Sequence, residues 1–494
     1  MGNLPGKIYW IGLSLIAIIG MGLVLYSTVW GAGLISDSFQ YIATAKTMAS
    51  HGYWGYLSED GSFIPLTQYP PFFPAVLALL EFLGINSLNG VRFFNATLMG
   101  INIILVGVTL RYITKSALWG ILGAVLFAFN RVFLEAHAWA LSEPLYYFLA
   151  LLGLYLLALS IERQDRRYWW AGGVLTLAAL TRYIGIALIF SGMLVLLGGK
   201  KPVWQKVIRS LSFGGLSLLP LGLWTLRNAL LTKTINNRSL SFVPLTIKNI
   251  LSLIQTILGW FVPSVWVIGH EKIWLFLLIG LSITLGIWWV ISWRTSQKSI
   301  TKTAWFNPLA ILWFFATIFH LAFLIIAKIG FDHNIGFGDR LLSPLWLGGI
   351  ILIVTSMAVL WEEKNAISHW LVILCGSYLI VYFLAGSIVA LPAWHKQGLG
   401  LARKSWHTSQ AILTLQTLDS GRIYSNSPST VYLWTGSPGH SLTEFSQIRE
   451  SNSSVDVYLV VFHHIPENAR LTRLEDGLPI VIEDRIATIY RYPP

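Results

Sequence analysis

Two acidic residues stand where a carboxylate could act at the edge of a membrane. Asp37 lies in LISDSFQYIATAKTMASHGYWGY, just after a long apolar run, and Glu143 lies in EAHAWALSEPLYYF, just before Pro144 opens another. A positioned carboxylate can take a proton from a hydroxyl. Each also has a plainer interpretation, because Asp37 with Gln40 matches a capping box and Glu143 suits the positive end of a helix dipole. A cap would also hold a catalytic carboxylate in place, so both interpretations stay open.

Four arginines are expected at the same membrane level, namely Arg131, Arg182, Arg227 and Arg340. A charge at mid-bilayer costs at least about 2.5–3.5 kcal/mol, so such residues usually face a cavity or a partner. Arg182 lies where two half-length apolar runs meet, and snorkelling to the interface is its alternative role. Arg340 begins another run beside Asp339, and a local ion pair between the two is the alternative there.

Carboxylates and arginines together indicate phosphate chemistry. The planar guanidinium fork matches the geometry of phosphate. At the outer interface of a lipid-soluble chain, this combination predicts a lipid-linked phosphate substrate. A metal held by Asp37, Glu143 and His137, with Glu135 nearby, is conceivable, but no ligand spacing supports it. We therefore predict no definite cofactor and leave a divalent metal as an open alternative.

The composition shows what must position these residues. Of the 494 residues, 55% are hydrophobic and only 11% are charged, against roughly 25% charged in a soluble domain. Most of the chain is therefore expected in lipid. The net charge of +12 comes from short clusters between apolar runs, which favours membrane topology over nucleic-acid binding. The single cysteine, Cys375, excludes an intrachain disulfide.

The apolar runs predict an α-helical polytopic membrane protein with about eleven transmembrane helices, because a span needs about 20 apolar residues. The candidate spans are 8–30, 88–112, 117–134, 144–161, 168–181, 184–198, 211–230, 272–293, 306–328, 341–361 and 370–391. The loops 111–115, 162–167, 198–209, 293–302 and 361–369 fall on one side, and most carry excess Lys and Arg. That side is predicted to be cytoplasmic, together with the N-terminus.

Two further segments complete the predicted organisation. The run 69–85 is short for a span, and crossing would flip every later charge cluster, so we place it as an interfacial or re-entrant helix that Pro70 and Pro71 open. The interval 31–87 then forms a first outer loop within a transmembrane catalytic domain, 1–391. The tail, 392–494, contains short β-type runs and predicts a small extracytoplasmic α/β domain.

The motifs and their order resemble the GT-C membrane glycosyltransferases. These polyprenyl-phosphate-sugar-dependent enzymes include protein O-mannosyltransferases and the aminoarabinose transferases of lipid A. The matching first-loop positions are Asp37, Tyr41, Pro70, Pro71 and Gly84. LSEPLYYF resembles the second acidic motif, with Glu143 where many members have Asp. ALTRYIG resembles the basic hairpin, and DRLLSPLW the Arg/Lys-x-x-x-Pro segment. Two positions depart from the pattern: Ser38 replaces the second acid of some members, and Tyr69 stands where many have His or Lys.

The resemblance implies a hexosyl- or pentosyltransferase that inverts the anomeric centre. Asp37 would be the general base, and Arg182 and Arg340 would clamp the donor phosphate. Glu143 would orient the acceptor or Asp37. Further substrate-binding candidates are Tyr69, Arg227 and His137.

The implied partners are a polyprenyl-phosphate sugar donor and a lipid, glycan or protein acceptor, in the plasma (cell inner) membrane, with the endoplasmic reticulum as an alternative. Nucleic acid is not expected. An outer-leaflet polysaccharide polymerase or ligase and a non-catalytic lipid-binding protein are the alternative functions. A transporter is disfavoured, because it would need polar segments at mid-membrane.

Overall fold

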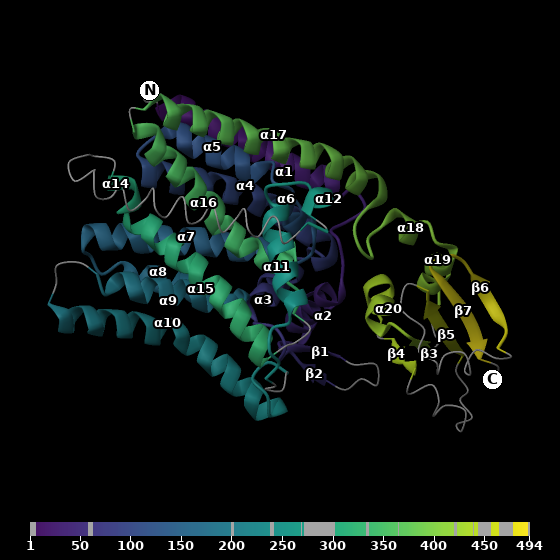
Figure 1. The fold of residues 1–494 in the computed structure, drawn as a ribbon. Coiled ribbons are helices and arrows are strands. Elements are labelled where there is room, and N and C mark those ends of the chain that lie inside the picture. Colours follow the sequence, from purple (N-terminus) through teal and green to yellow (C-terminus); the bar gives the residue numbers. More distant parts are fainter. Residues whose placement is uncertain are drawn as a thin grey trace.

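Long apolar helices form most of the molecule (Figure 1). The computed structural model describes residues 6–57, 63–198, 202–237, 242–267, 269–270, 302–331, 335–363, 365–418, 422–437, 439–442, 456–463 and 478–492. Within these ranges, seven helices are long and apolar enough to cross a bilayer. They are α1 (Gly6–Ser27), α4 (Ser87–Thr114), α7 (Glu143–Arg163), α10 (Val203–Thr232), α15 (Pro308–Gly330), α16 (Asp339–Glu362) and α17 (Ala366–Gln397).

Among the described residues, an eighth span is present only if a bent helix pair counts as one. Helices α5 (Ala117–Ala128) and α6 (Arg131–Ala138) meet at 57°. The bend has a local cause, because the side-chain oxygen of Asn130 accepts a hydrogen bond from the backbone N–H of Val132 at 3.0 Å and starts a new helix there. The run 117–134, which was predicted as one span, is therefore broken at this cap.

The predicted total of about eleven spans is not confirmed. Helices α8 (Tyr168–Thr181) and α9 (Ile186–Leu196) form a hairpin around the 3₁₀ turn η1 (Tyr183–Gly185), and each is shorter than a full span. The predicted span 272–293 lies outside the described residues. Between α10 and α15 the described residues also form the short helices α11 (Ile247–Gly259), α12 (Ser264–Val267) and α14 (Lys302–Trp305).

The first loop holds two helices and a small hairpin. Helix α2 (Ser36–His51) is followed by strands β1 (Gly55–Leu57) and β2 (Phe63–Pro65), which pair antiparallel. Helix α3 (Phe72–Phe82) follows Pro71, as predicted. Its 11 residues rise only about 17 Å at 1.5 Å per residue, too little to cross a hydrocarbon core about 30 Å thick.

The C-terminal part contains a five-stranded sheet in the order β4-β3-β5-β7-β6. Strand β3 (Arg422–Ser425) runs parallel to β4 (His440–Ser441) and β5 (Val457–Phe462), whereas β7 (Ala487–Tyr492) runs antiparallel to β5 and β6 (Ile480–Glu483). The described residues of this part also form the helices α18 (Lys404–His407), α19 (Gln410–Gln416) and α20 (Pro428–Thr435). The sheet confirms the predicted C-terminal strands, although α17 continues past residue 391 to Gln397.

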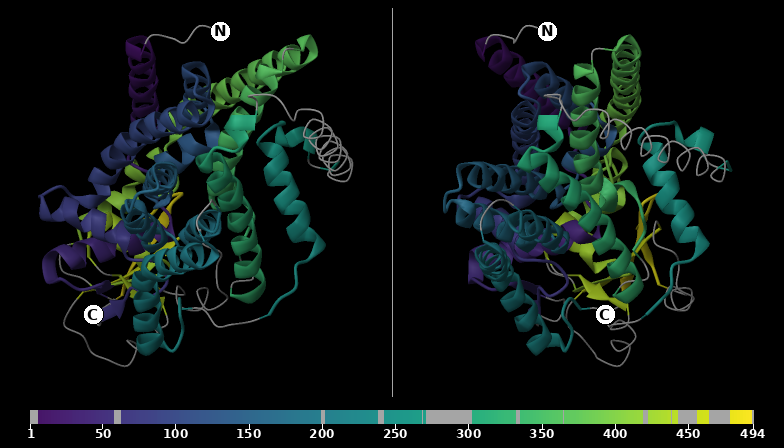
Figure 2. Two further views of the ribbon diagram at one scale, coloured as in Figure 1. Left: turned by 90° about the vertical axis from the view of Figure 1, so that its left-hand side faces the viewer. Right: turned by 60° about the vertical axis from the view of Figure 1, so that its left-hand side comes forward.

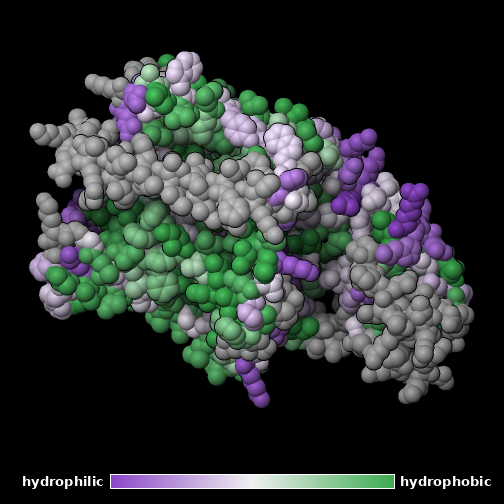
Figure 3. All heavy atoms as spheres, viewed as in Figure 1, coloured by the Kyte–Doolittle hydropathy of each residue, from purple (hydrophilic) through white to green (hydrophobic). Residues whose placement is uncertain are grey.

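The helices that carry the candidate site lie inside the bundle. In their most apolar segments, 72% of α16 and 67% of α7 are buried, against 28% of α1 and α17. Hydrophobic side chains, in green, cover most of the helical part on the face drawn in Figure 3. The turned view at the left of Figure 2 places the strands behind the helices, at the end of the bundle away from the N-terminus.

Candidate active site

Four charged residues from distant parts of the chain meet in one group, which we call the carboxylate–arginine cluster: Asp37, Glu143, Arg182 and Arg340. Arg340 bridges the two acids, with its Nη2 2.5 Å from Asp37 Oδ2 and its Nε 2.7 Å from Glu143 Oε1. Arg182 Nη1 lies 2.6 Å from the same Glu143 oxygen. The structure therefore brings together four of the six charged residues that the sequence placed at one membrane level, whereas Arg131 and Arg227 lie elsewhere.

Each member of the cluster stands at a helix end. Asp37, Glu143 and Arg340 lie in the first turns of α2, α7 and α16, and Arg182 follows the last residue of α8. Helix dipoles favour acids at N-termini and cations at C-termini. Three members obey this rule, whereas Arg340 stands at an N-terminus and is stabilised by its two carboxylate partners.

Two backbone and side-chain links hold these helix ends in place. Gly33, just before α2, donates its N–H to the carbonyl of Ala138 at 2.8 Å and accepts from the N–H of Ala140 at 2.9 Å. This short bridge brings the start of α2 beside the start of α7. Tyr147 in α7 donates to Ser343 Oγ, which donates to the carbonyl of Arg340 at 2.7 Å, so α7 also positions the start of α16.

The predicted capping role of Asp37 is wrong. The N-cap of α2 is Ile35, whose N–H donates to Ser38 Oγ at 3.2 Å. Asp37 lies inside the first turn, and its side chain turns toward Arg340 and Tyr69. Gln40, the expected partner in a capping box, instead donates to Gln68 Oε1 at 3.3 Å. The carboxylate of Asp37 is thereby available to the cluster.

Tyr69 is the second partner of Asp37. Its hydroxyl donates to Asp37 Oδ1 at 2.7 Å, and Gln68 Nε2 donates to the same hydroxyl at 3.3 Å. Burial and the neighbouring Asp37 carboxylate raise the pKa of Tyr69, so its hydroxyl stays neutral and can donate. Sequence reasoning selected Tyr69 as a departure from the family pattern but missed Gln68, whose only signal is its place before Tyr69.

The cluster is open on one side. The side chain of Glu143 is 1% exposed and that of Arg182 is 13% exposed, whereas Asp37 and Arg340 reach 18% and 35%. A substrate can thus approach Asp37 and Arg340 first. Glu143 Oε2 and Arg182 Nε are buried and make no hydrogen bond to the described residues. A buried polar atom without a hydrogen-bond partner lowers the stability of the folded protein, so such atoms are usually hydrogen-bonded.

Two predicted substrate-binding residues lie outside the cluster. His137 is completely buried, and its ring nitrogens contact Asn102 Nδ2 at 3.1 Å and the carbonyl of Phe133 at 2.7 Å. Arg227 donates to the carbonyls of Leu66 at 2.8 Å and Trp54 at 3.3 Å. His137 thus offers a substrate no exposed atom, and Arg227 braces the first loop close to Tyr69.

The ion pair between Arg340 and Asp339 that the sequence suggested as an alternative is not formed. Asp339 accepts from the indole N–H of Trp260 at 3.0 Å, while Arg340 pairs with the two acids of the cluster. Arg131 lies 3.8 Å from Glu135 on the surface of α6.

The cluster does not fit a metal held by both acids, because a guanidinium fills the position between them. Within the described ranges, no three His, Cys, Asp or Glu residues gather closely enough to hold a metal ion.

Comparisons with known proteins bear on this arrangement. Residues 9–199, which contain three members of the cluster, match the family described as dolichyl-phosphate-mannose-protein mannosyltransferase. The structure of ArnT from Cupriavidus metallidurans bound to undecaprenyl phosphate superposes with a TM-score of 0.57 at 14% identity, over 97% of each chain. The fold is that of the GT-C glycosyltransferases.

Two further structures share the GT-C fold. The apo state of the same ArnT gives a TM-score of 0.51 at 13% identity, over 99% of this chain and 98% of that one. The Archaeoglobus fulgidus oligosaccharyltransferase in the apo form gives 0.51 at 11% identity, over 92% and 69%. A comparison with curated proteins gave no match. The predicted resemblance and the predicted helical membrane fold with a C-terminal sheet region are confirmed.

Proposed function

We propose that this chain is a membrane glycosyltransferase that moves a sugar from a polyprenyl-phosphate-linked donor to an acceptor hydroxyl. The observation that carries the proposal is the carboxylate–arginine cluster, built at four helix ends of a GT-C fold. It combines a partly exposed carboxylate with two cations suited to phosphate. The family match and the ArnT structure bound to undecaprenyl phosphate support the same substrate class.

Asp37 is the proposed general base. It is the more exposed of the two acids, and Tyr69 and Arg340 fix both of its oxygens. Glu143 is a poor candidate for this step, because its side chain is almost wholly buried and pairs with both arginines. Glu143 instead anchors Arg182 and Arg340.

Arg340 is proposed to exchange partners when the donor binds. Its guanidinium, on a side chain that is 35% exposed, spans the two acids. A donor phosphate arriving at the open side would compete for the Nη2 group that now contacts Asp37. Asp37 would then be released to accept a proton, while Arg182 and the Nε of Arg340 remain held by Glu143.

The proposed reaction is a single displacement at the anomeric carbon. Asp37 takes the proton of the acceptor hydroxyl, whose oxygen forms the new glycosidic bond as the bond between the anomeric carbon and the phosphate oxygen breaks. The electron pair leaves with the polyprenyl phosphate, whose charge Arg340 and Arg182 stabilise. Attack opposite to the leaving group inverts the anomeric configuration.

The proposed location follows from charge. The described basic loops after α4 and α7 lie at the helix ends away from the cluster, so the cluster and the C-terminal sheet would face the extracytoplasmic side of the plasma membrane. The acceptor, a lipid, glycan or protein, would arrive from that side.

The proposed function can be tested by incubating the purified protein with a panel of radiolabelled polyprenyl-phosphate sugars and an acceptor. We expect transfer of label from at least one donor to an acceptor, or slow hydrolysis of that donor to free sugar. A chain that binds undecaprenyl phosphate yet turns over none of the donors would instead support a non-catalytic lipid-binding function.

A further inference from the structure

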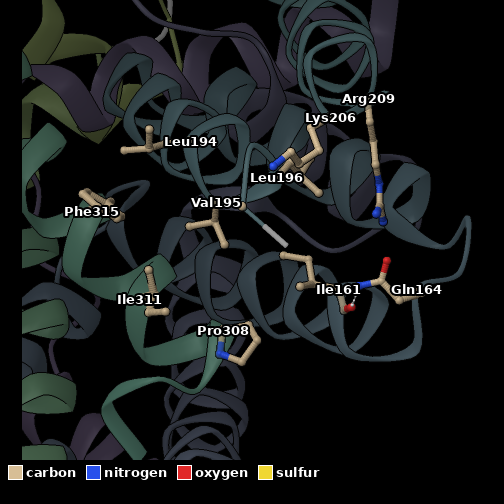
Figure 4. A pocket seen from close by; sticks show the side chains of 11 residues that line it. Ile161, Gln164, Leu194, Val195, Leu196, Lys206, Arg209, Pro308, Ile311 and Phe315 are labelled. Carbon is tan, nitrogen blue, oxygen red and sulfur yellow. Dashed lines mark hydrogen bonds between the residues drawn. The ribbon is translucent and has the colours of Figure 1, made fainter. Parts of the chain in front are cut away.

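A cavity of about 480 Å³ lies at the far end of the bundle from the cluster. Its walls come from the ends of α7 and α9 and the starts of α10 and α15 (Figure 4). Helix α7 begins at Glu143 in the cluster, and its residue Ile161, 18 positions later, lines the cavity, so the helix rises about 27 Å between the two sites. That length matches the hydrocarbon core of a bilayer. The cavity therefore lies near the opposite membrane surface.

The inner walls of this cavity are apolar. Val195, Ile311 and Phe315 line the side away from the charged rim, as Figure 4 shows. Leu194, also in the wall, is 38% exposed, so the apolar lining continues onto the outer surface of the bundle. Because that surface faces lipid, an acyl chain can enter the cavity sideways from the bilayer.

The rim of the cavity is cationic. Lys206 and Arg209 lie three residues apart on α10, and therefore on one face of the helix. The guanidinium of Arg209 lies 4.5 Å from the ring centre of Tyr168, and its Nη2 lies 3.4 Å from the carbonyl oxygen of Asp165. Its Nε is buried and makes no hydrogen bond to the described residues. The guanidinium of Arg209 therefore keeps one donor that no described residue uses.

The described wall of the cavity contains no carboxylate side chain. The nearby Asp165 carboxylate accepts from Ser160 Oγ at 2.9 Å and lies 3.3 Å from Arg167 Nε. The described rim thus places two cationic side chains beside an apolar cavity.

We propose that this cavity binds an anionic phospholipid of the leaflet opposite the active site. Its phosphate lies between Lys206 and Arg209, and one acyl chain packs against Val195, Ile311 and Phe315. Basic pockets between transmembrane helices on the cytoplasmic side are suited to acidic head groups. The general preference for Lys and Arg on the cytoplasmic side would by itself explain cations at this surface. It would not explain the cavity beside them or the buried Arg209 Nε that makes no hydrogen bond to the described residues. The inference does not depend on the proposed transfer reaction.

Native mass spectrometry of the full-length protein tests this site, using phosphatidylglycerol and phosphatidylcholine with identical acyl chains. We expect one phosphatidylglycerol to bind more tightly than phosphatidylcholine. Lys206→Gln combined with Arg209→Gln should weaken phosphatidylglycerol binding about 10- to 30-fold, from about 1 kcal/mol per basic residue at a membrane surface. Ile311→Trp should weaken binding of both lipids by filling the cavity.

Arg166→Gln is the matched control, since it removes one cation from an exposed position outside the cavity. It should leave phosphatidylglycerol binding unchanged. Inorganic phosphate at the same concentration should not displace the lipid, because it lacks the acyl chain. The proposal would be overturned if the two lipids bound equally well, or if neither the double variant nor Ile311→Trp changed phosphatidylglycerol binding. It would also be overturned if Arg166→Gln lost as much phosphatidylglycerol binding as the double variant, or if inorganic phosphate displaced the lipid. Thermal unfolding measurements check that each variant is folded. If the double variant does not fold, Ile311→Trp still tests whether the lipid occupies the cavity.

Discussion

At the scale of single residues, the central feature is one arginine shared by two acids. Arg340 contacts Asp37 and Glu143, and Glu143 also contacts Arg182. The two acids differ because Glu143 is buried while Asp37 faces the open side. On this division rest the proposed anchoring role of Glu143 and the proposed proton transfer by Asp37.

Replacing Glu143 should therefore affect folding first. Glu143→Gln leaves two arginines without their shared carboxylate. Breaking a buried ion pair typically costs about 3–5 kcal/mol, so we expect a clearly lower Tm in detergent than for the wild type. Asp37→Asn, at the exposed edge, is the comparison. An equal or smaller loss of Tm in Glu143→Gln would contradict the anchoring role.

Tyr69 should affect turnover rather than folding. Tyr69→Phe keeps the ring but removes the hydroxyl that donates to Asp37 Oδ1. A hydrogen bond to a charged group contributes about 1.5–3 kcal/mol, so kcat should fall about 10- to 100-fold with Tm nearly unchanged. Steady-state transfer assays check this. Unaltered kcat would show that Tyr69 does not position Asp37.

At the scale of elements, the α8–η1–α9 turn places Arg182. The turn is tight, because a Cβ on Gly185 would lie 2.5 Å from the backbone nitrogen of Ala179 and 2.6 Å from its Cα. A side chain there must push the turn away from the end of α8. Arg182, three residues earlier, would move with it.

Gly185→Ala should therefore weaken donor binding. Overpacking of this kind costs about 1–3 kcal/mol, and the displaced Arg182 should lower affinity for undecaprenyl phosphate, measured by equilibrium binding. Gly173→Ala in α8 is the matched control, because a Cβ there meets no atom within 4 Å. If the two variants bind undecaprenyl phosphate equally well, the turn does not set the position of Arg182.

At the scale of the whole molecule, the described basic loops after α4 and α7 and the carboxylate–arginine cluster lie at opposite ends of the helices. This separation predicts that the C-terminal sheet and the cluster face outward. Ser437→Cys, exposed beyond α20, and Arg166→Cys, exposed between α7 and α8, report on the two ends in a Cys375→Ser background. An impermeant thiol reagent should label only Ser437→Cys in intact cells. Labelling of Arg166→Cys alone would invert the topology.

The sequence allowed the cluster members to be predicted but not their pairing. Asp37, Glu143, Arg182 and Arg340 could be selected because charges are rare and costly in apolar segments. Their contacts depend on how four helix ends meet, which local patterns do not encode. Asp37 was predicted as the N-cap, but the helix begins one residue earlier, at Ser36, so Asp37 lies in its first turn. The cap at Asn130 bends an apolar run that looks continuous in the sequence. His137 was selected by residue type alone, and tertiary packing buried it.

The most direct test of the account is the transfer rate of Asp37→Asn with the donor that the wild type uses best. The amide keeps the size of the side chain and can still accept from Tyr69, but it cannot act as a base. We expect transfer to fall about 10²–10⁴-fold, with undecaprenyl phosphate still bound and the protein still folded. Near-wild-type transfer by folded Asp37→Asn would contradict the assignment of Asp37 as the base.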